Sequence, residues 1–258
     1  MKQSTFVAVV IFLAIVAGIV IWWFILGNPG NFIDGTNRQK PNNLMGMVFT
    51  GGYIVPALIA ASITVITFII ERLLSLKKAQ GRGAIATFLK NVQKNLSDNN
   101  IEAAIKECEK QRGSMANILR AGLEKYSELK KENKILDAEK QMAEVQRAIE
   151  EATALEMPIL EKNLIILSTI ASIATMLGLF GTVIGMIRAF QALAHAGAPD
   201  AIQLSIGISE ALVNTALGIF AAIVGIISYN FFVNKVDTFT YMIDEASFDM
   251  IQTLKVRE

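Results

Sequence analysis

The stretch from Ser205 to Phe232 combines two properties that rarely occur together. It is apolar and long enough to cross a bilayer as a helix, yet it carries an acidic residue, Glu210. A charged side chain at the centre of a membrane helix costs about 2.5–3.5 kcal/mol on insertion scales, so such residues usually have a function. The stretch therefore predicts a membrane protein, and it makes Glu210 the first candidate functional residue.

Three further uncharged runs are long enough to cross a membrane, and they cover residues 6–26, 41–70 and 163–187. Charged residues make up 18% of the chain, below the roughly 25% of soluble proteins. The first run exceeds the roughly 7–15-residue apolar core of a signal peptide, and it ends in Trp22 and Trp23, which suit a membrane interface. We expect a retained span here, with a cleaved signal peptide as the alternative.

Most charged residues lie in the middle of the chain. Residues 71–162 hold 17 of the 24 Lys and Arg and 15 of the 23 Asp and Glu, a balance that does not support nucleic-acid binding. Four spans place both termini on one side of the membrane, together with this middle segment and 21 of the 24 cations. Because positive charge favours the cytoplasmic side, we predict an inner-membrane protein with both termini cytoplasmic.

The predicted fold is all-α, with four transmembrane helices and long cytoplasmic helical extensions. It divides into an extra N-terminal transmembrane helix with an outer loop (1–47), a second transmembrane helix (48–72), a cytoplasmic helical domain (73–162), a core of two transmembrane helices (163–233) and a cytoplasmic tail (234–258). An apolar stripe with helical spacing predicts one long helix before the third span, through Ala138, Met142, Val145, Ile149, Ala152 and Ile159. Pro158 is expected to kink this helix.

The third and fourth spans each have a face of small and polar residues. At about 100° per residue, the face of the third span contains Ser168, Ala171, Thr175, Gly178, Gly181, Thr182 and Gly185. The face of the fourth span contains Glu210, Asn214, Gly218, Ala221, Gly225 and Ser228. We expect the glycines to allow close helix packing, whereas periodicity leaves Thr175 and Thr182 open between packing and pore lining. Thr215 lies about 140° from Glu210, toward the flank.

Neither span contains a cation that could pair with Glu210, since Arg188 closes the third span at its end. We therefore expect Glu210 to face no cation of its own chain and to serve proton relay or ion passage. His195, the sole histidine, is expected to lie in a loop. Cys108 is expected to be a packed thiol, and the chain shows no enzyme motif, metal-ligand spacing or cofactor signature.

Two phrases, LGLFGTVIGMIRAF (Leu177–Phe190) and GISEALVNTALGIFAAIVGIISYNFF (Gly207–Phe232), resemble the ExbB/TolQ/MotA family of proton-channel proteins, most closely ExbB and TolQ. The resemblance implies a homo-oligomer, usually a pentamer, around the single helices of ExbD- or TolR-like partners. It implies that the proton gradient drives a TonB- or TolA-like protein, while an aspartate on the partner's helix carries the proton. By position it assigns Thr182, Glu210 and Thr215 to the ion pathway, whereas spacing alone favours Asn214 over Thr215.

The chain departs from the family pattern in two respects. Family members usually have proline where this chain has Thr175 and Val224, and the first span is extra relative to the usual three. Two other functions stay open: a MotA-like motility stator, and a non-conducting membrane scaffold whose small residues only pack helices together.

Overall fold

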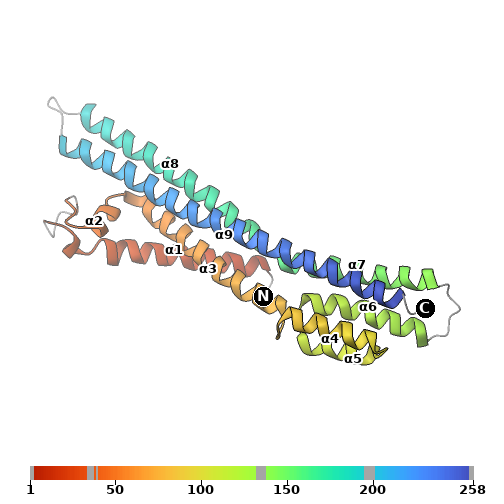
Figure 1. Ribbon diagram of the computed structural model, residues 1–258. Helices are drawn as coiled ribbons and strands as arrows, with labels where there is room; N and C mark the ends of the chain where they lie inside the picture. The colour runs from red at the N-terminus through yellow and green to blue at the C-terminus, as the bar shows by residue number, and fades with distance from the viewer. Residues whose placement is uncertain (1–2, 34–37, 39, 132–137, 195–200, 256–258) are drawn as a thin grey trace. The chain divides into compact units, whose positions relative to one another are not determined.

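A computed structural model describes residues 3–33, 38, 40–131, 138–194 and 201–255, and the described chain is almost entirely helical (Figure 1). Its α-helices are α1 (Gln3–Val20), α2 (Leu44–Phe49), α3 (Val55–Gln80), α4 (Ile85–Ser97), α5 (Ile101–Gln111), α6 (Ser114–Lys131), α7 (Ala138–Glu161), α8 (Leu164–Ala194) and α9 (Ala201–Lys255). A π-helical segment η1 (Ile21–Leu26) extends α1, and two 3₁₀ turns are η2 (Pro29–Asn31) and η3 (Gly52–Ile54). His195 lies outside the described residues.

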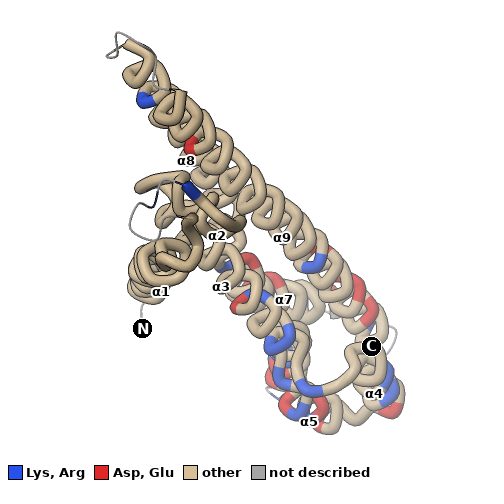
Figure 2. The backbone as a smooth tube through the Cα atoms, turned by 90° about the vertical axis from the view of Figure 1, so that its left-hand side faces the viewer, with Lys and Arg blue, Asp and Glu red and all other residues tan. Residues whose placement is uncertain are grey.

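Four of the described helical segments are long and apolar enough to cross a membrane, and they begin at Thr5, Gly52, Glu139 and Ala201. The prediction of an all-α membrane protein with four spanning helices is therefore confirmed. The chain forms two compact units, one from residues 1–70 and 163–230 and one from residues 71–162 and 231–258. Charged side chains gather along the helices of the second unit, while α1 carries none (Figure 2).

In the first unit, α1 packs against α3. The rings of Phe6 and Phe68 meet edge to face with centroids 6.4 Å apart. A Cβ on Gly18 would lie 2.5 Å from the Pro56 carbonyl oxygen, so glycine is what lets the two helices approach. Trp22 stacks on Phe49 at 4.8 Å, and its indole N–H donates to the Phe49 carbonyl at 3.4 Å. This tryptophan is therefore packed inside the unit rather than exposed at its surface.

The helices α8 and α9 form an antiparallel pair whose contact is made by small residues. A Cβ on Gly185 would lie 2.7 Å from the Ala211 backbone nitrogen, and one on Gly218 would lie 2.7 Å from the Ala174 carbonyl oxygen. Gly178 lies against Gly218 in the same way, and Gly181 lies against the Asn214 side chain. Gly225 meets Ala171 nearer the other end of the contact. Glycine backbones thus bring the two polar faces together along most of their length.

The second unit is a bundle of α4, α5, α6 and α7 with the ends of α3 and α9. Its core includes Phe88, Leu119, Leu123, Tyr126, Val145 and Ile243, all buried. The stripe predicted on α7 is correct at Met142, Val145 and Ile149 but wrong at its end. Ile159 is 51% exposed and Leu160 is buried in its place, because at about 100° per residue Leu160 lies in line with Met142 and Ile159 lies to the side. The helix continues through Pro158 to Glu161, and the backbone leaves helical geometry at Asn163, where φ is 62°.

Candidate functional site

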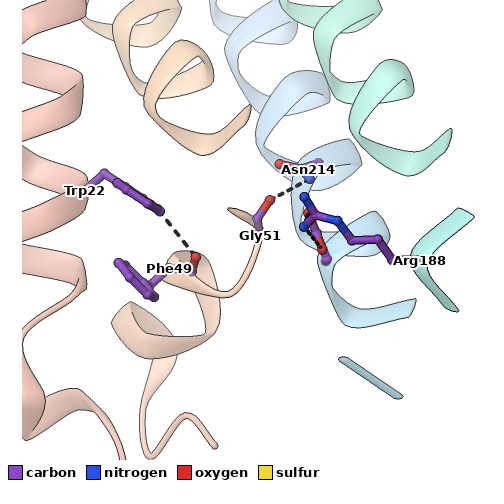
Figure 3. Close-up of polar contacts among 6 residues, drawn as sticks. Trp22, Phe49, Gly51, Arg188 and Asn214 are labelled. Atoms are coloured by element: carbon purple, nitrogen blue, oxygen red, sulfur yellow. Dashed lines mark hydrogen bonds and ion pairs between the residues drawn. The ribbon is translucent and has the colours of Figure 1, made fainter. Parts of the chain in front are cut away.

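Glu210 forms an ion pair with Arg188, which corrects the expectation that it faces no cation of its own chain. Both oxygens of its carboxylate accept hydrogen bonds from Arg188 Nη1, at 2.6 and 2.8 Å (Figure 3). The Glu210 side chain is 5% exposed, whereas the Arg188 side chain is 46% exposed. The buried carboxylate is therefore neutralised by a guanidinium that reaches it from the more open side of the helix pair.

Helix register explains the pairing. Arg188 lies six residues before the end of α8 at Ala194, and Glu210 lies nine residues after the start of α9 at Ala201. At 1.5 Å per residue these positions are about 9 and 14 Å from the neighbouring helix ends, so an antiparallel pair places them at similar depth. Treating each helix separately hides this relation. The pairing could have been predicted from the sequence, because Arg188 and Glu210 lie at similar distances from the connection between the two helices.

The turn before α3 closes over the same carboxylate. Gly52 has φ 78°, and a Cβ there would lie 3.1 Å from the Glu210 carboxyl carbon and 3.5 Å from Arg188 Nη1. The preceding residue, Gly51, accepts a hydrogen bond from Asn214 Nδ2 at 2.8 Å through its carbonyl oxygen (Figure 3). Sequence reasoning assigned this Gly-Gly pair no role. Two adjacent glycines at the start of a span could have indicated this role, because glycine lets the backbone approach a neighbouring side chain closely.

Asn214 is fully buried between this turn and α8. Its Nδ2 bonds to Gly51, but its Oδ1 has no hydrogen-bond partner among the residues that the structure describes. A buried acceptor without a partner costs about 1–3 kcal/mol, which suits a position that meets water or another donor in the assembled protein. Asn214 therefore joins the site through contacts that periodicity alone could not identify.

Thr182 and Thr215 are brought together across the α8–α9 contact. Their hydroxyl oxygens are in direct hydrogen-bonding contact. Thr182 Oγ1 also donates toward the carbonyl oxygens of Gly178 and Ala211, at 3.2 and 3.4 Å. Helical rotation placed Thr215 on the flank of α9, away from Glu210. This flank faces α8, so Thr215 contacts Thr182 directly. Thr175 does not join them, because its side chain is exposed and bonds to the Ala171 carbonyl at 3.1 Å.

The threonine hydroxyl pair and the Arg188–Glu210 ion pair lie at different positions along α8. Thr182 precedes Arg188 by six residues, so the hydroxyl pair lies about 9 Å along α8 from the guanidinium. A hydroxyl both donates and accepts hydrogen bonds, so two in contact can pass a proton to a neighbouring group. The carboxylate of Glu210, in contrast, is held by a fixed cation. Its chemistry is that of a stationary charge beside the path rather than of a free acid.

Comparison with known proteins places the chain in a family. The family model described as the MotA/TolQ/ExbB proton channel family matches residues 110–245, just over half of the chain. The chain is 39% identical over 115 residues to the Tol-Pal system protein TolQ of Pseudomonas aeruginosa, a match that covers 45% of this chain and 49% of that protein.

Two other relatives extend the comparison. The Tol-Pal system protein TolQ of Haemophilus influenzae is 39% identical over 114 residues, which cover 44% of this chain and 49% of that protein. The biopolymer transport protein ExbB of Aquifex aeolicus is 42% identical over 77 residues, covering 30% and 52% of the two chains. The chain thus spans about half the length of these relatives.

Proposed function

We propose, from the premise that this chain belongs to the MotA/TolQ/ExbB proton channel family, that it is the channel subunit of an ExbB/TolQ-type motor complex. In this role it couples the proton motive force to outer-membrane transport, as in a TonB-like system, or to envelope maintenance, as in a Tol-like system. Family membership supports a membrane subunit of the transport class rather than an enzyme.

The contact between Thr182 and Thr215 is the observation that carries this proposal. Two hydroxyls from adjacent membrane helices meet at a depth where the surrounding residues are small or apolar. They offer a proton an acceptor and a donor within the protein, where water is scarce. Glu210, paired with Arg188, supplies a fixed field beside this path. The acid that gains and loses the proton then belongs to a partner's helix.

The proposed assembly follows from that division of roles. The subunit forms a homo-oligomer, a pentamer by analogy with the family, in the bacterial inner membrane with both termini cytoplasmic. An ExbD/TolR-like single-span protein supplies the proton-carrying acid, and a TonB/TolA-like protein receives the work. Many large apolar side chains on α8 and α9 are exposed in the single chain, including Phe180 and Phe220 at 56% and 64%, which supports contact with lipid or with further helices.

Two alternatives predict different results. The extra span favours a MotA-like motility stator, and the glycine packing of α8 against α9 favours a non-conducting scaffold. A stator subunit would restore swimming rather than envelope function when it replaces a missing one. A scaffold would tolerate Glu210→Leu and both threonine substitutions, because packing alone does not require an ionisable or hydroxyl group there.

The test is gradient-driven work by the chain expressed together with an ExbD/TolR-like single-span protein. Glu210→Gln and Thr215→Ala are each expected to abolish this work and proton flux into proteoliposomes, while the complex still assembles. Thr169→Ala is the matched control, because Thr169 is exposed on α8 and bonds to the Ile165 carbonyl of its own helix. Full activity of both Glu210→Gln and Thr215→Ala would refute the proposed function.

A further inference from the structure

The second unit contains a cavity of about 690 Å³ that the proposed channel function does not use. Its walls come from the end of α3, the α5–α6 turn, α6 and the end of α7. Seven charged side chains line it, four of them cations: Lys78, Arg112, Arg120 and Lys162. A hollow of this size that is lined by charged side chains from several elements is a candidate binding site.

Two of the three acids of the cavity accept hydrogen bonds from neighbouring side chains. Both carboxylate oxygens of Glu71 accept hydrogen bonds from Arg72 at 2.8 Å, and Arg72 is fully buried behind the wall. Glu156 accepts a hydrogen bond from Asn117 at 2.8 Å. Glu109 is exposed. Arg72 therefore neutralises Glu71, which leaves four cations and two acids, Glu109 and Glu156, on the cavity wall.

The cations, in contrast, have donors to spare. Across the described part of the chain, Lys78, Arg112 and Lys162 have no ion-pair partner. Arg120 differs, because its Nε pairs with Glu124 Oε1 at 3.4 Å. Several cations around one cavity favour a phosphate group.

The position of these cations along the chain indicates where the phosphate comes from. Lys78 follows Ile70, the last residue of an uncharged run, by eight residues in α3, about 12 Å along the helix. Lys162 directly precedes the uncharged run 163–187. Long basic side chains just outside a span extend toward the headgroup layer. Leu74, one turn before Lys78 on the same face of α3, is 64% exposed and offers an acyl chain a surface.

We propose that this cavity binds the phosphate headgroup of an anionic phospholipid. Lys78, Arg112 and Lys162 hold the phosphate, and Arg120, which pairs with Glu124, adds positive charge to the same wall. The acyl chains of the lipid lie along the face of α3 that carries the exposed Leu74 side chain. The site ties the membrane-proximal ends of α3 and α7 to one lipid molecule, independently of the ion pathway.

Native mass spectrometry of the purified full-length chain in detergent tests the site, with phosphatidylglycerol and phosphatidylcholine of identical acyl chains as probes. We expect phosphatidylglycerol to be retained preferentially. The variant K78Q/R112Q/K162Q should lose about fivefold in phosphatidylglycerol affinity per cation, hence roughly a hundredfold in total, and with it the preference over zwitterionic phosphatidylcholine. The control K77Q/K106Q/K140Q removes the same charge from positions outside the cavity and should keep the preference.

Two further measurements keep the proposal falsifiable if the triple variant unfolds. Glu109→Gln removes the exposed acid of the cavity and should tighten phosphatidylglycerol binding about fivefold. Inorganic phosphate should compete weakly, because it lacks the acyl chains. The proposal is overturned if the parent shows no preference for phosphatidylglycerol, if both triple variants lose binding equally, if Glu109→Gln leaves binding unchanged, or if phosphate competes as strongly as the lipid.

Discussion

Arg188 on α8 donates through one nitrogen, Nη1, to both carboxylate oxygens of Glu210 on α9, at 2.6 and 2.8 Å. The pair links the two helices near their connected ends, and Gly52 packs its backbone against the carboxylate from a third direction. A carboxyl group within a membrane-spanning segment is thereby enclosed by a cation and a backbone turn of its own chain.

Removing Arg188 should destabilise the protein more than removing the pair. Arg188→Gln leaves a buried carboxylate without its cation, at a cost of about 2–3 kcal/mol, toward the low end for buried pairs because Arg188 is half exposed. The double variant Arg188→Gln/Glu210→Gln should recover most of this loss. Equilibrium unfolding in detergent micelles measures the cycle. Strictly additive losses would show that the two side chains do not interact.

Gly52 should not tolerate a side chain. Its φ of 78° is unfavourable for other residues, and a Cβ would press on the Glu210 carboxyl group. We expect Gly52→Ala to reduce the free energy of unfolding by about 2 kcal/mol or more. Gly30→Ala is the control, because its Cβ would meet a single atom, Asn28 Oδ1, at an ordinary 3.4 Å. Equal effects of the two substitutions in thermal unfolding would contradict the close packing at Gly52.

The hydroxyl of Thr182, rather than its volume, should matter for proton passage. Thr182→Ser keeps the hydroxyl and is expected to retain most of the gradient-driven activity. Thr182→Val keeps the shape but removes the donor and acceptor that meet Thr215, and it should reduce proton flux by at least about tenfold. Flux into proteoliposomes containing the co-expressed complex is the measurement. A fully active Thr182→Val protein would mean that this contact only packs the helices.

Cys108 should be unreactive while the second unit is folded. Burial raises the pKa of its thiol to about 12; Arg120 lowers this pKa by a smaller amount, whereas Glu107 and Glu124 raise it further. Because the thiolate is the nucleophile, iodoacetamide should label it at pH 8 on the order of a thousandfold more slowly than an exposed thiol. The comparison is Ala154→Cys in a Cys108→Ala background, since Ala154 is exposed on α7.

The same pKa has a consequence for stability. The folded protein retains the thiol proton up to about pH 12, whereas the unfolded chain releases it near pH 9. Stability from this group is therefore constant below about pH 9 and is lost as the pH rises toward 12. The Cys108→Ala variant should lack this part of the alkaline destabilisation. Unfolding measured in the two proteins between pH 8 and 11 tests the sign.

Several features of the site could be predicted because they are local. Rotation about one helix axis groups Gly178, Gly181 and Gly185 on one face, and these residues lie in the contact with α9. The same rotation placed Thr215 on a flank, and only the crossing of the two helices reveals that this flank faces Thr182. Thr175 shares the face of Thr182 but lies on its exposed side, since the partner helix covers only part of that face.

The amino-acid sequence by itself determined the four spanning helices, the charged middle segment and the small faces of α8 and α9, because hydropathy and helical period act over neighbouring residues. The tertiary structure alone decided that Arg188 neutralises Glu210, that Asn214 bonds to Gly51, and that two threonine hydroxyls meet. These contacts depend on the register and crossing of separate helices. Burial and charge pairing are properties of that arrangement, and no single helix contains the information.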